Sequence, residues 1–504
     1  MVKDSDLRRA NPWWLNRDGI QEDELIKEWE NSTIKYDPRL RHKIVYDFEP
    51  QNTVVYTLRG PRQVGKSTLI KLQIRDFLKK GISPWNIFYY ALDLAESPKE
   101  IVEVIEGYLQ LTKRQRKEDR CYIFLDEASS VENWQKGVKW LIDGGRLPNC
   151  TLLASGSHAI NIKTGTELLP GRKGKIEDNY DKVLIPMKFS EYATLLDKGI
   201  KNMVFENSLI SFEVRKAIFT KLVNREIDER LDVINSHVDE LNNIFQEYMQ
   251  TGGTPKIVDE KLKTGTISEH LYTNYLDTFK GDWNKLGKKE TLLKQFCGAI
   301  IKALGSRTSW NKLSQAAELG SDNTAQDYAL TLKDLFLLTI IHMYGEEKKI
   351  PLIKKERKLY FHDPYFLHIF NGWMSPSDNF GTSEKFLEDK INQGRMAEQI
   401  VADHLIRWAF ILSEKKQTFD YYNHVFYWED GNNREVDFIF YDGKDIEVPI
   451  EVKYRNSIDP REFPALFQFF RKTRTKNGIV LSEKEFDVKS EYVVIPVSVF
   501  LMLI

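Results

Sequence analysis

A glycine-rich loop between an expected strand and an expected helix constrains the fold of this chain more than any other feature. Residues 53–70, TVVYTLRGPRQVGKSTLI, pass from a β-branched and aromatic run through the spacing Gly60-x₄-Gly65-Lys66-Ser67 into a segment with helical apolar spacing. In the order strand, loop and helix, the loop's backbone N–H groups and the helix N-terminus can surround a phosphate group. The sequence therefore predicts an α/β domain that is built on a parallel sheet and contains a P-loop, or Walker A motif.

The side chains of this loop predict both cofactors. Lys66 is expected to reach the β- and γ-phosphates of ATP, and Ser67 to supply a hydroxyl ligand to Mg²⁺. The other expected nucleotide contacts come from Gly60, Pro61, Gly65 and Thr68.

A second apolar run ends in two carboxylates, as a Walker B strand does. It has the sequence RCYIFLDEASSV, residues 120–131. Asp126 is expected to position Mg²⁺ and Glu127 to activate the attacking water. An Asp-Glu pair after a strand can also cap a helix, but its place downstream of a P-loop favours the catalytic interpretation.

Two further residues are candidates for the same site. The run NCTLLASGSHAI, residues 149–160, predicts a strand that ends in Ser155-Gly156-Ser157, where a small polar side chain can contact the γ-phosphate or the water. Ser155 is the candidate sensor. Arg172 follows in a Gly-Arg pair on an expected loop. It is either an arginine finger that completes the site of a neighbouring subunit or a surface arginine, and the spacing alone leaves both open.

The motifs together resemble a family of archaeal and bacterial AAA+-like P-loop ATPases over nearly the full length of the chain. The matching stretches, in order, are NPWW, LRGPRQVGKST, FYYALD, YIFLDEASSVENWQKGVKWLID, ASGS, LPGR and IPMKFSEY. The resemblance implies a winged helix after the ATPase core and a PD-(D/E)XK nuclease-like domain at the C-terminus. It also implies nucleotide-site roles for Gly60, Gly65, Lys66, Ser67, Asp126 and Glu127.

The 504 residues predict several domains of an α/β multi-domain protein, with 41% hydrophobic and 29% charged residues as in an ordinary globular chain. The expected domains are an N-terminal extension (1–45), the P-loop ATPase core (46–195), a helical lid or linker (196–285), a winged-helix-like domain (286–375) and a nuclease-like domain (376–504).

Composition excludes some classes of function. A net charge of −1 argues against a basic nucleic-acid coat protein, and the three cysteines lack the spacing of a zinc site. No run of 18 apolar residues predicts a membrane span, and the C-terminal YVVIPVSVFLMLI predicts a closing strand and helix. The expected location is the cytoplasm, without a membrane partner.

The expected winged helix, TSWNKLSQAAELGSDNTAQDYALTLKDLFLLTIIHMY at 308–344, has a weak case for binding DNA. Its second helix contains Asp327 and Asp334 against Lys333, although a DNA-reading helix is usually basic. The basic run KKERK at 354–358 is either a phosphate contact or a solvated turn. DNA contact and a protein-partner role both stay open.

A second carboxylate cluster lies near the C-terminus. The resemblance places Glu398, Asp437 and Glu451 as ligands of a nuclease metal, with Lys453 beside them. Glu451 and Lys453 share a strand face, and Asp437 joins that face in a plain hairpin only if the loop after Tyr441 has an odd number of residues. A three-residue loop DGK or a bulge at Pro449 would satisfy this condition, whereas a two-residue Asp-Gly turn would not.

The expected function is Mg²⁺-dependent ATP binding and hydrolysis, coupled to movement or gating of the winged-helix and nuclease-like modules. Two alternatives remain: an ATP-switched DNA nuclease, and a non-catalytic adaptor whose contact with protein partners is regulated by nucleotide. Homo-oligomerisation is a further expectation, since Arg172 could act in trans only between subunits.

Overall fold

The computed structural model describes residues 3–37, 39, 53–116, 120–157, 180–413, 419–473, 475 and 477–504. The chain divides into two compact units. The first comprises Met1–Ile185 with Asp334–Phe336, and the second comprises Pro186–Lys333 with Leu337–Ile504.

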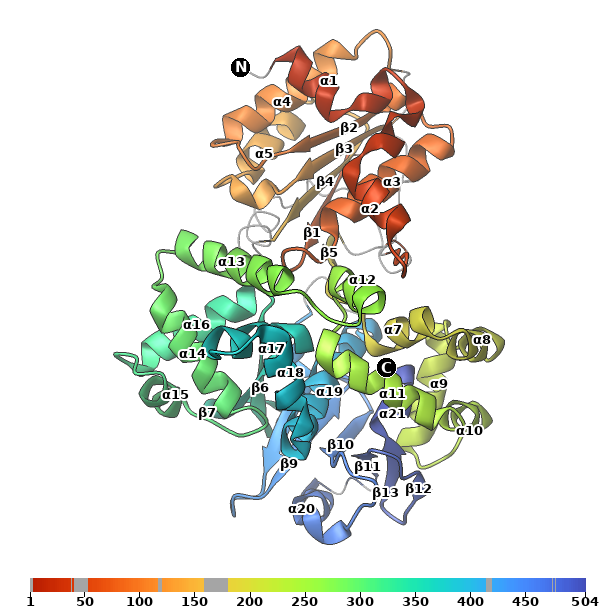
Figure 1. Ribbon diagram of the computed structural model, residues 1–504, viewed down its shortest axis with the longest axis vertical. Helices are drawn as coiled ribbons and strands as arrows, with labels where there is room; N and C mark the ends of the chain where they lie inside the picture. Colours follow the sequence, from red (N-terminus) through yellow and green to blue (C-terminus); the bar gives the residue numbers. More distant parts are fainter. Residues whose placement is uncertain are drawn as a thin grey trace. The chain divides into compact units, whose positions relative to one another are not determined.

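The first unit is built on a five-stranded sheet with the order β2-β3-β4-β1-β5, in which all the strand pairs are parallel. The strands are β1 (Val54–Arg59), β2 (Ile87–Ala91), β3 (Cys121–Asp126), β4 (Cys150–Gly156) and β5 (Asp181–Val183). Strands β1, β3 and β4 are apolar along most of their length because helices cover both faces of the sheet. Figure 1 shows α2 (Glu24–Asn31) and α3 (Lys66–Lys79) on one face, and α4 (Pro98–Leu111) and α5 (Gln135–Asp143) on the other. The predicted strand, P-loop and helix, and the parallel sheet, are confirmed.

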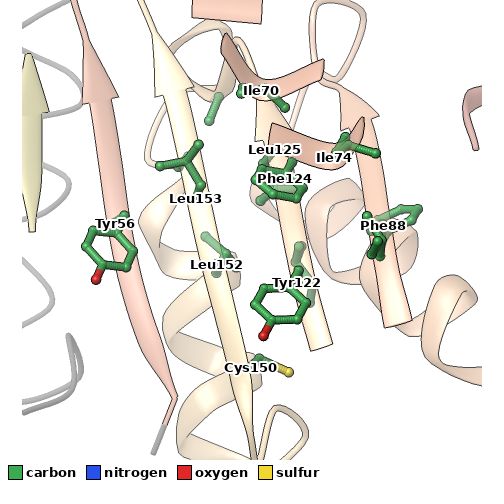
Figure 2. Close-up of a cluster of buried hydrophobic side chains, with 14 of the residues drawn as sticks. Tyr56, Ile70, Ile74, Phe88, Tyr122, Phe124, Leu125, Cys150, Leu152 and Leu153 are labelled. Carbon is green, nitrogen blue, oxygen red and sulfur yellow. The ribbon is translucent and has the colours of Figure 1, made fainter. Parts of the chain in front are cut away.

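The core of this unit lies between α3 and the sheet. Figure 2 shows Ile70 and Ile74 of α3 beside aromatic and aliphatic side chains of the strands. Phe77, one turn further along α3, has its ring centroid 4.5 Å from that of Tyr122. This packing fixes α3 on the sheet and with it the P-loop that joins α3 to β1.

The N-terminal segment is part of the same core. It contains α1 (Asp4–Ala10), the short helices η1 (Pro12–Trp14) and η2 (Arg17–Glu22), and α2. The indole nitrogens of Trp13 and Trp14 donate hydrogen bonds of 3.1 and 3.0 Å to the carbonyl oxygen of Ile87 at the start of β2. The segment expected to be an extension therefore covers part of the five-stranded sheet.

The second unit begins with helices, as predicted. They are α7 (Phe189–Leu196), α8 (Lys198–Glu206), α9 (Phe212–Val223), α10 (Glu229–Asn235), α11 (Val238–Thr251), α12 (Pro255–Thr264), α13 (Glu269–Lys285) and α14 (Glu290–Lys302). The predicted turn in TGGTPK separates α11 from α12, and Gly252 has a φ of +59° there. An alanine at this position would place Cβ 1.8 Å from Asp363 Oδ1.

A mixed eight-stranded sheet follows, in the order β12-β13-β11-β10-β9-β8-β6-β7. Its strands are β6 (Leu338–Gly345), β7 (Ile350–Phe361), β8 (Val425–Glu429), β9 (Glu435–Tyr441), β10 (Glu447–Val452), β11 (Gly478–Ser482), β12 (Asp487–Val488) and β13 (Tyr492–Pro496). The predicted order of helix, turn, helix and strand is present as α15 (Trp310–Ala316), α16 (Asp322–Asp334) and β6. Because β6 pairs with β8, the expected winged-helix and nuclease-like segments share one sheet.

The remaining helices of this unit are α17 (Pro364–Met374), α18 (Asn379–Glu388), α19 (Lys390–Leu412), α20 (Pro464–Thr473) and α21 (Val497–Leu503). Helix α19 packs against β7, β8, β9 and β10. The predicted closing strand and helix are β13 and α21. Among the helices of the described ranges, none combines the length and apolarity needed to span a bilayer.

Candidate nucleotide site and carboxylate centre

Two glycines let the P-loop turn from β1 into α3. Gly60 has a φ of +153°, and a Cβ on it would lie 1.9 Å from the carbonyl oxygen of Leu184. Gly65 has a φ of +101° and is the N-cap of α3. Both positions therefore require glycine, the first for space and the second for its left-handed backbone.

The predicted phosphate-binding side chains lie in the loop and in the first turn of α3. Lys66 is 5% exposed, and its Nζ donates hydrogen bonds to the carbonyl oxygens of Gly60 (3.0 Å) and Pro61 (2.9 Å). Ser67 and Thr68 follow at the helix N-terminus and are partly exposed. Their position at the positive end of the helix suits an anion.

Strand β4 lies between the P-loop strand β1 and the carboxylate strand β3. At its end, the Ser155 hydroxyl donates to Oδ1 of Asp126, which is 3% exposed. The hydroxyl of Tyr89 donates to the other oxygen, Oδ2, at 3.0 Å. The sheet order therefore brings Ser155 and Asp126 into contact, and in this structure the hydroxyl of Ser155 is directed at the carboxylate of Asp126.

Glu127 is held by hydrogen bonds from two directions. Its backbone has a φ of +50°, and its N–H donates to Ser155 Oγ at 3.1 Å. Its carboxylate Oε2 accepts a hydrogen bond of 3.0 Å from the hydroxyl of Ser157. A left-handed residue directly after a strand, with a fixed side chain, is a strained arrangement of the kind found at functional sites. The role of Ser157 was not predicted from the sequence, although it stands in the same Ser-Gly-Ser run as Ser155.

Other residues next to this site had no predicted role. Nζ of Lys71 lies 3.5 Å from the ring centroid of Tyr89 and 3.0 Å from Asp23 Oδ2. Burial lowers the pKa of Lys71, and burial together with Asp126 raises the pKa of Tyr89. Burial, with Glu127 and Asp126, also raises the pKa of Asp93. Tyr89 therefore stays protonated and remains a hydrogen-bond donor to Asp126. Sequence patterns could not show these contacts because the partners come from separate segments.

Arg172 lies outside the described residues, between 157 and 180. Its assignment as an arginine finger stays a prediction.

The second predicted cluster lies on β9, β10 and α19, and the hairpin register explains why it gathers. Ile450 pairs with Phe438 and Glu447 with Tyr441, so the loop between the strands has the five residues 442–446. The predicted odd number is confirmed, although neither the three-residue loop nor a bulge at Pro449 is used in this hairpin. The loop closes through Asp442, whose Oδ1 accepts hydrogen bonds from the backbone N–H groups of Lys444 (2.8 Å) and Ile446 (3.0 Å).

We call the resulting cluster the carboxylate centre, and it contains Lys358, Tyr360, Glu398, Glu435, Asp437, Glu451 and Lys453. Lys358 Nζ lies 2.7 Å from Glu398 Oε1, 2.9 Å from Glu435 Oε1 and 3.1 Å from Asp437 Oδ1. The hydroxyl of Tyr360 donates to the same Glu398 oxygen at 2.5 Å. The run KKERK, expected to be a solvated turn or a phosphate contact, is thus part of β7, and its last lysine is fully buried.

The remaining members of the centre meet on its other side. Lys453 Nζ donates to Glu451 Oε2 at 2.8 Å and lies 3.6 Å from Asp437 Oδ2, which accepts the backbone N–H of Val452 at 2.9 Å. Burial raises the pKa of Glu398 to about 7 and that of Glu451 well above its ordinary value. Burial would raise the pKa of Asp437 as well, but Lys453 and Lys358 outweigh it and hold that pKa low.

The structure brings Glu398, Asp437, Glu451 and Lys453 to one place, as the resemblance implied. However, no group of three or more histidine, cysteine or acidic side chains in the described parts of the chain is arranged to hold a metal ion. Lys358, which the sequence did not single out, lies between Glu398 and Asp437. Metal ligation by Glu398, Asp437 and Glu451 stays a prediction from the sequence, and the position of Lys358 argues against it.

Three family models match separate parts of the chain. Residues 52–193 match an AAA domain, residues 242–377 match a domain of unknown function (DUF8612), and residues 393–500 match another (DUF4143). The matches to relatives are distant. An uncharacterized protein of Haemophilus influenzae is 26% identical over 44% of this chain and 59% of its own length. An uncharacterized protein of Methanocaldococcus jannaschii is 23% identical over 66% of this chain and 60% of its own.

The chain thus spans about six tenths of the length of these two relatives. Among solved structures, a Walker-type ATPase of Pyrococcus abyssi is 15% identical, with a TM-score of 0.38 over 70% of this chain and 97% of its own. The ORC2 protein of Aeropyrum pernix is 13% identical, with a TM-score of 0.32 over 73% of this chain and 95% of its own. Taken together, residues 52–193 match an AAA domain, and the described part of this segment has the parallel sheet and the P-loop of the P-loop NTPase fold.

Proposed function

We propose that the first unit binds ATP with Mg²⁺ and hydrolyses it. The observation that carries this proposal is the meeting of three neighbouring strand ends. Asp126 ends β3 and Glu127 follows it, Ser155 lies near the end of β4, and β4 is the neighbour of the P-loop strand β1. The hydroxyl of Ser67 and the carboxylate of Asp126 are the hard oxygen donors that Mg²⁺ prefers, so this donor set fits the ion. When bound, Mg²⁺ would neutralise charge that develops on the phosphate oxygens.

Within this proposal, Glu127 orients and activates the attacking water. Its carboxylate is anchored through one oxygen, Oε2, by Ser157, so the other oxygen can accept a hydrogen bond from water. Lys66 binds the β- and γ-phosphates, and the backbone N–H groups from Gly60 to Gly65 surround the β-phosphate. Ser155 acts by fixing the carboxylate of Asp126 and the backbone of Glu127.

We further propose that hydrolysis moves or gates the second unit. Leu184, in the first unit, donates its backbone N–H to the carbonyl oxygen of Arg59 at the end of β1, at 2.8 Å. Pro186, in the second unit, accepts a hydrogen bond of 2.7 Å from Arg407 of α19. Since Ile185 alone separates these two anchored residues, a displacement of the P-loop strand would pass to α19 through a very short piece of backbone.

The segment after Pro186 is anchored just as firmly within the second unit. The backbone N–H of Met187 donates to the carbonyl oxygen of Gly253 at 2.8 Å, and that of Phe189 donates to His404 Nε2 at 2.8 Å. The hydroxyl of Tyr248 donates to the carbonyl oxygen of Met187 at 2.8 Å. These contacts connect the segment to α11, to the turn before α12 and to α19, which supports a mechanical role for it.

Two substitutions test the nucleotide site. Lys66→Ala should abolish nucleotide binding, and Glu127→Gln should retain ATP while hydrolysis falls by at least about 100-fold, because the general base is removed. Lys79→Ala, at the exposed end of the same helix, and Glu132→Gln, an exposed acid beyond β3, are the matched controls. Equilibrium binding of a fluorescent ATP analogue and phosphate release measure the two steps. Parental hydrolysis in either site variant would refute the assignment.

The carboxylate centre favours a non-catalytic role for the second unit over DNA cleavage, since Lys358 lies between two of the expected metal ligands. We therefore propose, as the second candidate, that nucleotide regulates an adaptor function of the second unit toward a protein partner. DNA contact and homo-oligomerisation through Arg172 remain proposals from the sequence. Size measurement with and without ATP tests the oligomer.

A further inference from the structure

We propose that Lys358 takes the place of a divalent cation in the carboxylate centre, which makes the centre a permanent internal ion cluster instead of a metal-dependent cleavage site. The carboxylate centre lies entirely in the second unit, so its metal binding is tested independently of ATP hydrolysis in the first unit.

Lys358 is held in the centre by its burial. Its side chain is 0% exposed and extends from β7 among residues of α19 and β9. A buried ammonium without carboxylate partners is strongly destabilising, so the folded state retains it only where the carboxylates stabilise it. Moving the lysine away from these carboxylates would leave a buried ammonium unpaired, which is strongly unfavourable.

Lys358 bridges several carboxylates of the centre. Its ammonium contacts carboxylate oxygens from three residues, Glu398, Glu435 and Asp437, at 2.7 to 3.1 Å. Bridging several carboxylates with one positive charge is what a metal ion would do at this position. A second cation would meet the ammonium of Lys358 at close range, and their repulsion would oppose its binding.

Most carboxylate oxygens that face the centre already accept a hydrogen bond or an ion pair. Oε1 of Glu398 already accepts from Lys358 and Tyr360. Both oxygens of Asp437 are also occupied, Oδ1 by Lys358 and Oδ2 by the backbone N–H of Val452. Glu451 Oε2 is bonded to Lys453, and its Oε1 is a buried oxygen without a hydrogen-bond partner. Most carboxylate oxygens of the centre thus already accept a hydrogen bond or ion pair, and a divalent cation would have to displace these donors in order to bind.

The ion cluster has a structural consequence. Lys358 joins β7 to α19 and β9, and Glu435 is bonded in turn to Arg307, which precedes α15, at 2.7 Å. Charged groups therefore connect the β6–β7 hairpin and the residues before α15 to the helix and strands of the C-terminal sheet. This connection suits a rigid binding body better than a site that must admit a metal ion and a DNA strand.

Manganese binding to the nucleotide-free full chain tests the proposal. Electron paramagnetic resonance measures free Mn²⁺ and so the amount that is bound. Wild type and Asp437→Asn should bind the same amount of Mn²⁺. Lys358→Met, which keeps the length of the side chain without its charge, should gain about one bound Mn²⁺ per chain, and adding Asp437→Asn should abolish that gain. Lys354→Met, an exposed lysine on the same strand, should behave as wild type.

Two results would overturn the proposal. One is an Mn²⁺ ion bound by wild type and lost in Asp437→Asn but kept in Asp126→Asn, which would place a metal in the centre beside Lys358. The other is a folded Lys358→Met variant that gains no Mn²⁺, which would show that the lysine does not occupy a cation position. If Lys358→Met does not fold, the comparison of wild type with Asp437→Asn still decides.

Cleavage of DNA gives an independent readout. Wild type incubated with supercoiled plasmid and Mg²⁺ or Mn²⁺, with and without ATP, should leave the plasmid intact. Nicking that disappears in both Asp437→Ala and Lys453→Ala, but persists in Lys66→Ala, would contradict the proposal. Nicking that persists equally in Asp437→Ala and Lys453→Ala does not depend on the carboxylate centre, and this outcome would agree with a centre that does not cleave.

Discussion

The hydroxyl of Ser157 donates a hydrogen bond of 3.0 Å to Oε2 of Glu127. Glu127 follows β3, which is two strands away from the P-loop strand β1 in the sheet. The proposed general base is therefore oriented by a residue on the chain segment directly after β4. Such an orienting bond affects how often the base points at the water and has little effect on phosphate binding.

Ser157→Ala should therefore lower kcat by about 10-fold, the effect of losing one well-aligned hydrogen bond, and change KM for ATP by much less. Ser157→Thr keeps the hydroxyl and should restore most of the rate. Ser130→Ala, an exposed serine that follows Glu127, is the control. Steady-state phosphate release measures all three variants. An unchanged kcat in Ser157→Ala would show that Glu127 needs no support from this hydroxyl.

Gly60 offers a second prediction, on stability and nucleotide binding together. In Gly60→Ala the new methyl group would overlap the carbonyl oxygen of Leu184, and neither backbone can move freely. We expect a loss of at least about 3 kcal/mol and loss of ATP binding. Gly81→Ala also has a positive φ, of +89°, but no atom within 4 Å of its new methyl group, so it should cost only about 1 kcal/mol. Thermal denaturation and binding of a fluorescent ATP analogue compare the two, and equal losses would contradict the steric argument.

The nucleotide site was predictable because its chemistry is local in sequence. Lys66 and Ser67 follow directly from the glycine spacing, and Asp126 and Glu127 from the end of an apolar strand. The loop and the strand fix the backbone between these neighbours, so the sequence pattern alone predicts where their side chains lie. The role of Ser157 was not predicted, because its contact with Glu127 depends on the left-handed backbone of Glu127, which no sequence pattern indicates.

The carboxylate centre was predictable only in part. Its acidic members were found by residue type and order, and the loop parity correctly placed Asp437 and Glu451 on one face. Lys358 was overlooked because a basic run usually lies in solvent. Its partners Glu398 and Asp437 stand 40 and 79 residues away, so only the tertiary fold shows that this lysine is buried among acids.

The N-terminal segment supplies a third prediction. Asn11 is fully buried, and its side chain donates to the carbonyl oxygen of Tyr89 at 3.0 Å and accepts the N–H of Tyr89 at 2.7 Å. It thereby pairs the backbone of the edge strand β2, whose Tyr89 also donates to Asp126. Asn11→Ala should cost about 2 to 4 kcal/mol, because the carbonyl oxygen and the N–H of Tyr89, both partly buried, lose their partner.

The matched control for Asn11→Ala is Asn16→Ala. Asn16 is exposed and caps η2 through a hydrogen bond of 3.2 Å from the N–H of Asp18, so its loss should cost about 1 kcal/mol. Urea denaturation measures both. ATP hydrolysis at a temperature where Asn11→Ala stays folded should also be reduced, because Tyr89 positions Asp126. Equal stability of the two variants would mean that the N-terminal segment is an appendage rather than part of the ATPase core.

His404 leads to a prediction on pH. It accepts the N–H of Phe189 through Nε2 and donates through Nδ1 to the carbonyl oxygen of Ile400 at 2.8 Å, so it must be neutral. Burial lowers its pKa to about 3. The charged groups that face it are Asp403, which opposes this shift, and Arg407 and Lys188, which add to it. In the unfolded chain its pKa is about 6.5, so below that pH the unfolded state takes up a proton that the folded state refuses.

The contribution of His404 to stability is therefore complete above about pH 6.5 and is lost as the pH falls, by about 1.4 kcal/mol for each pH unit down to the folded pKa. Asp363, whose pKa is raised to about 7 by burial, acts in the opposite direction, so the total pH dependence mixes both. The difference in the free energy of unfolding between wild type and His404→Gln isolates the contribution of His404. Urea denaturation between pH 8 and pH 4.5 should show the variant less stable at pH 8 and approaching or overtaking wild type on acidification. A constant difference for His404→Gln across this pH range would show that this histidine is not held neutral.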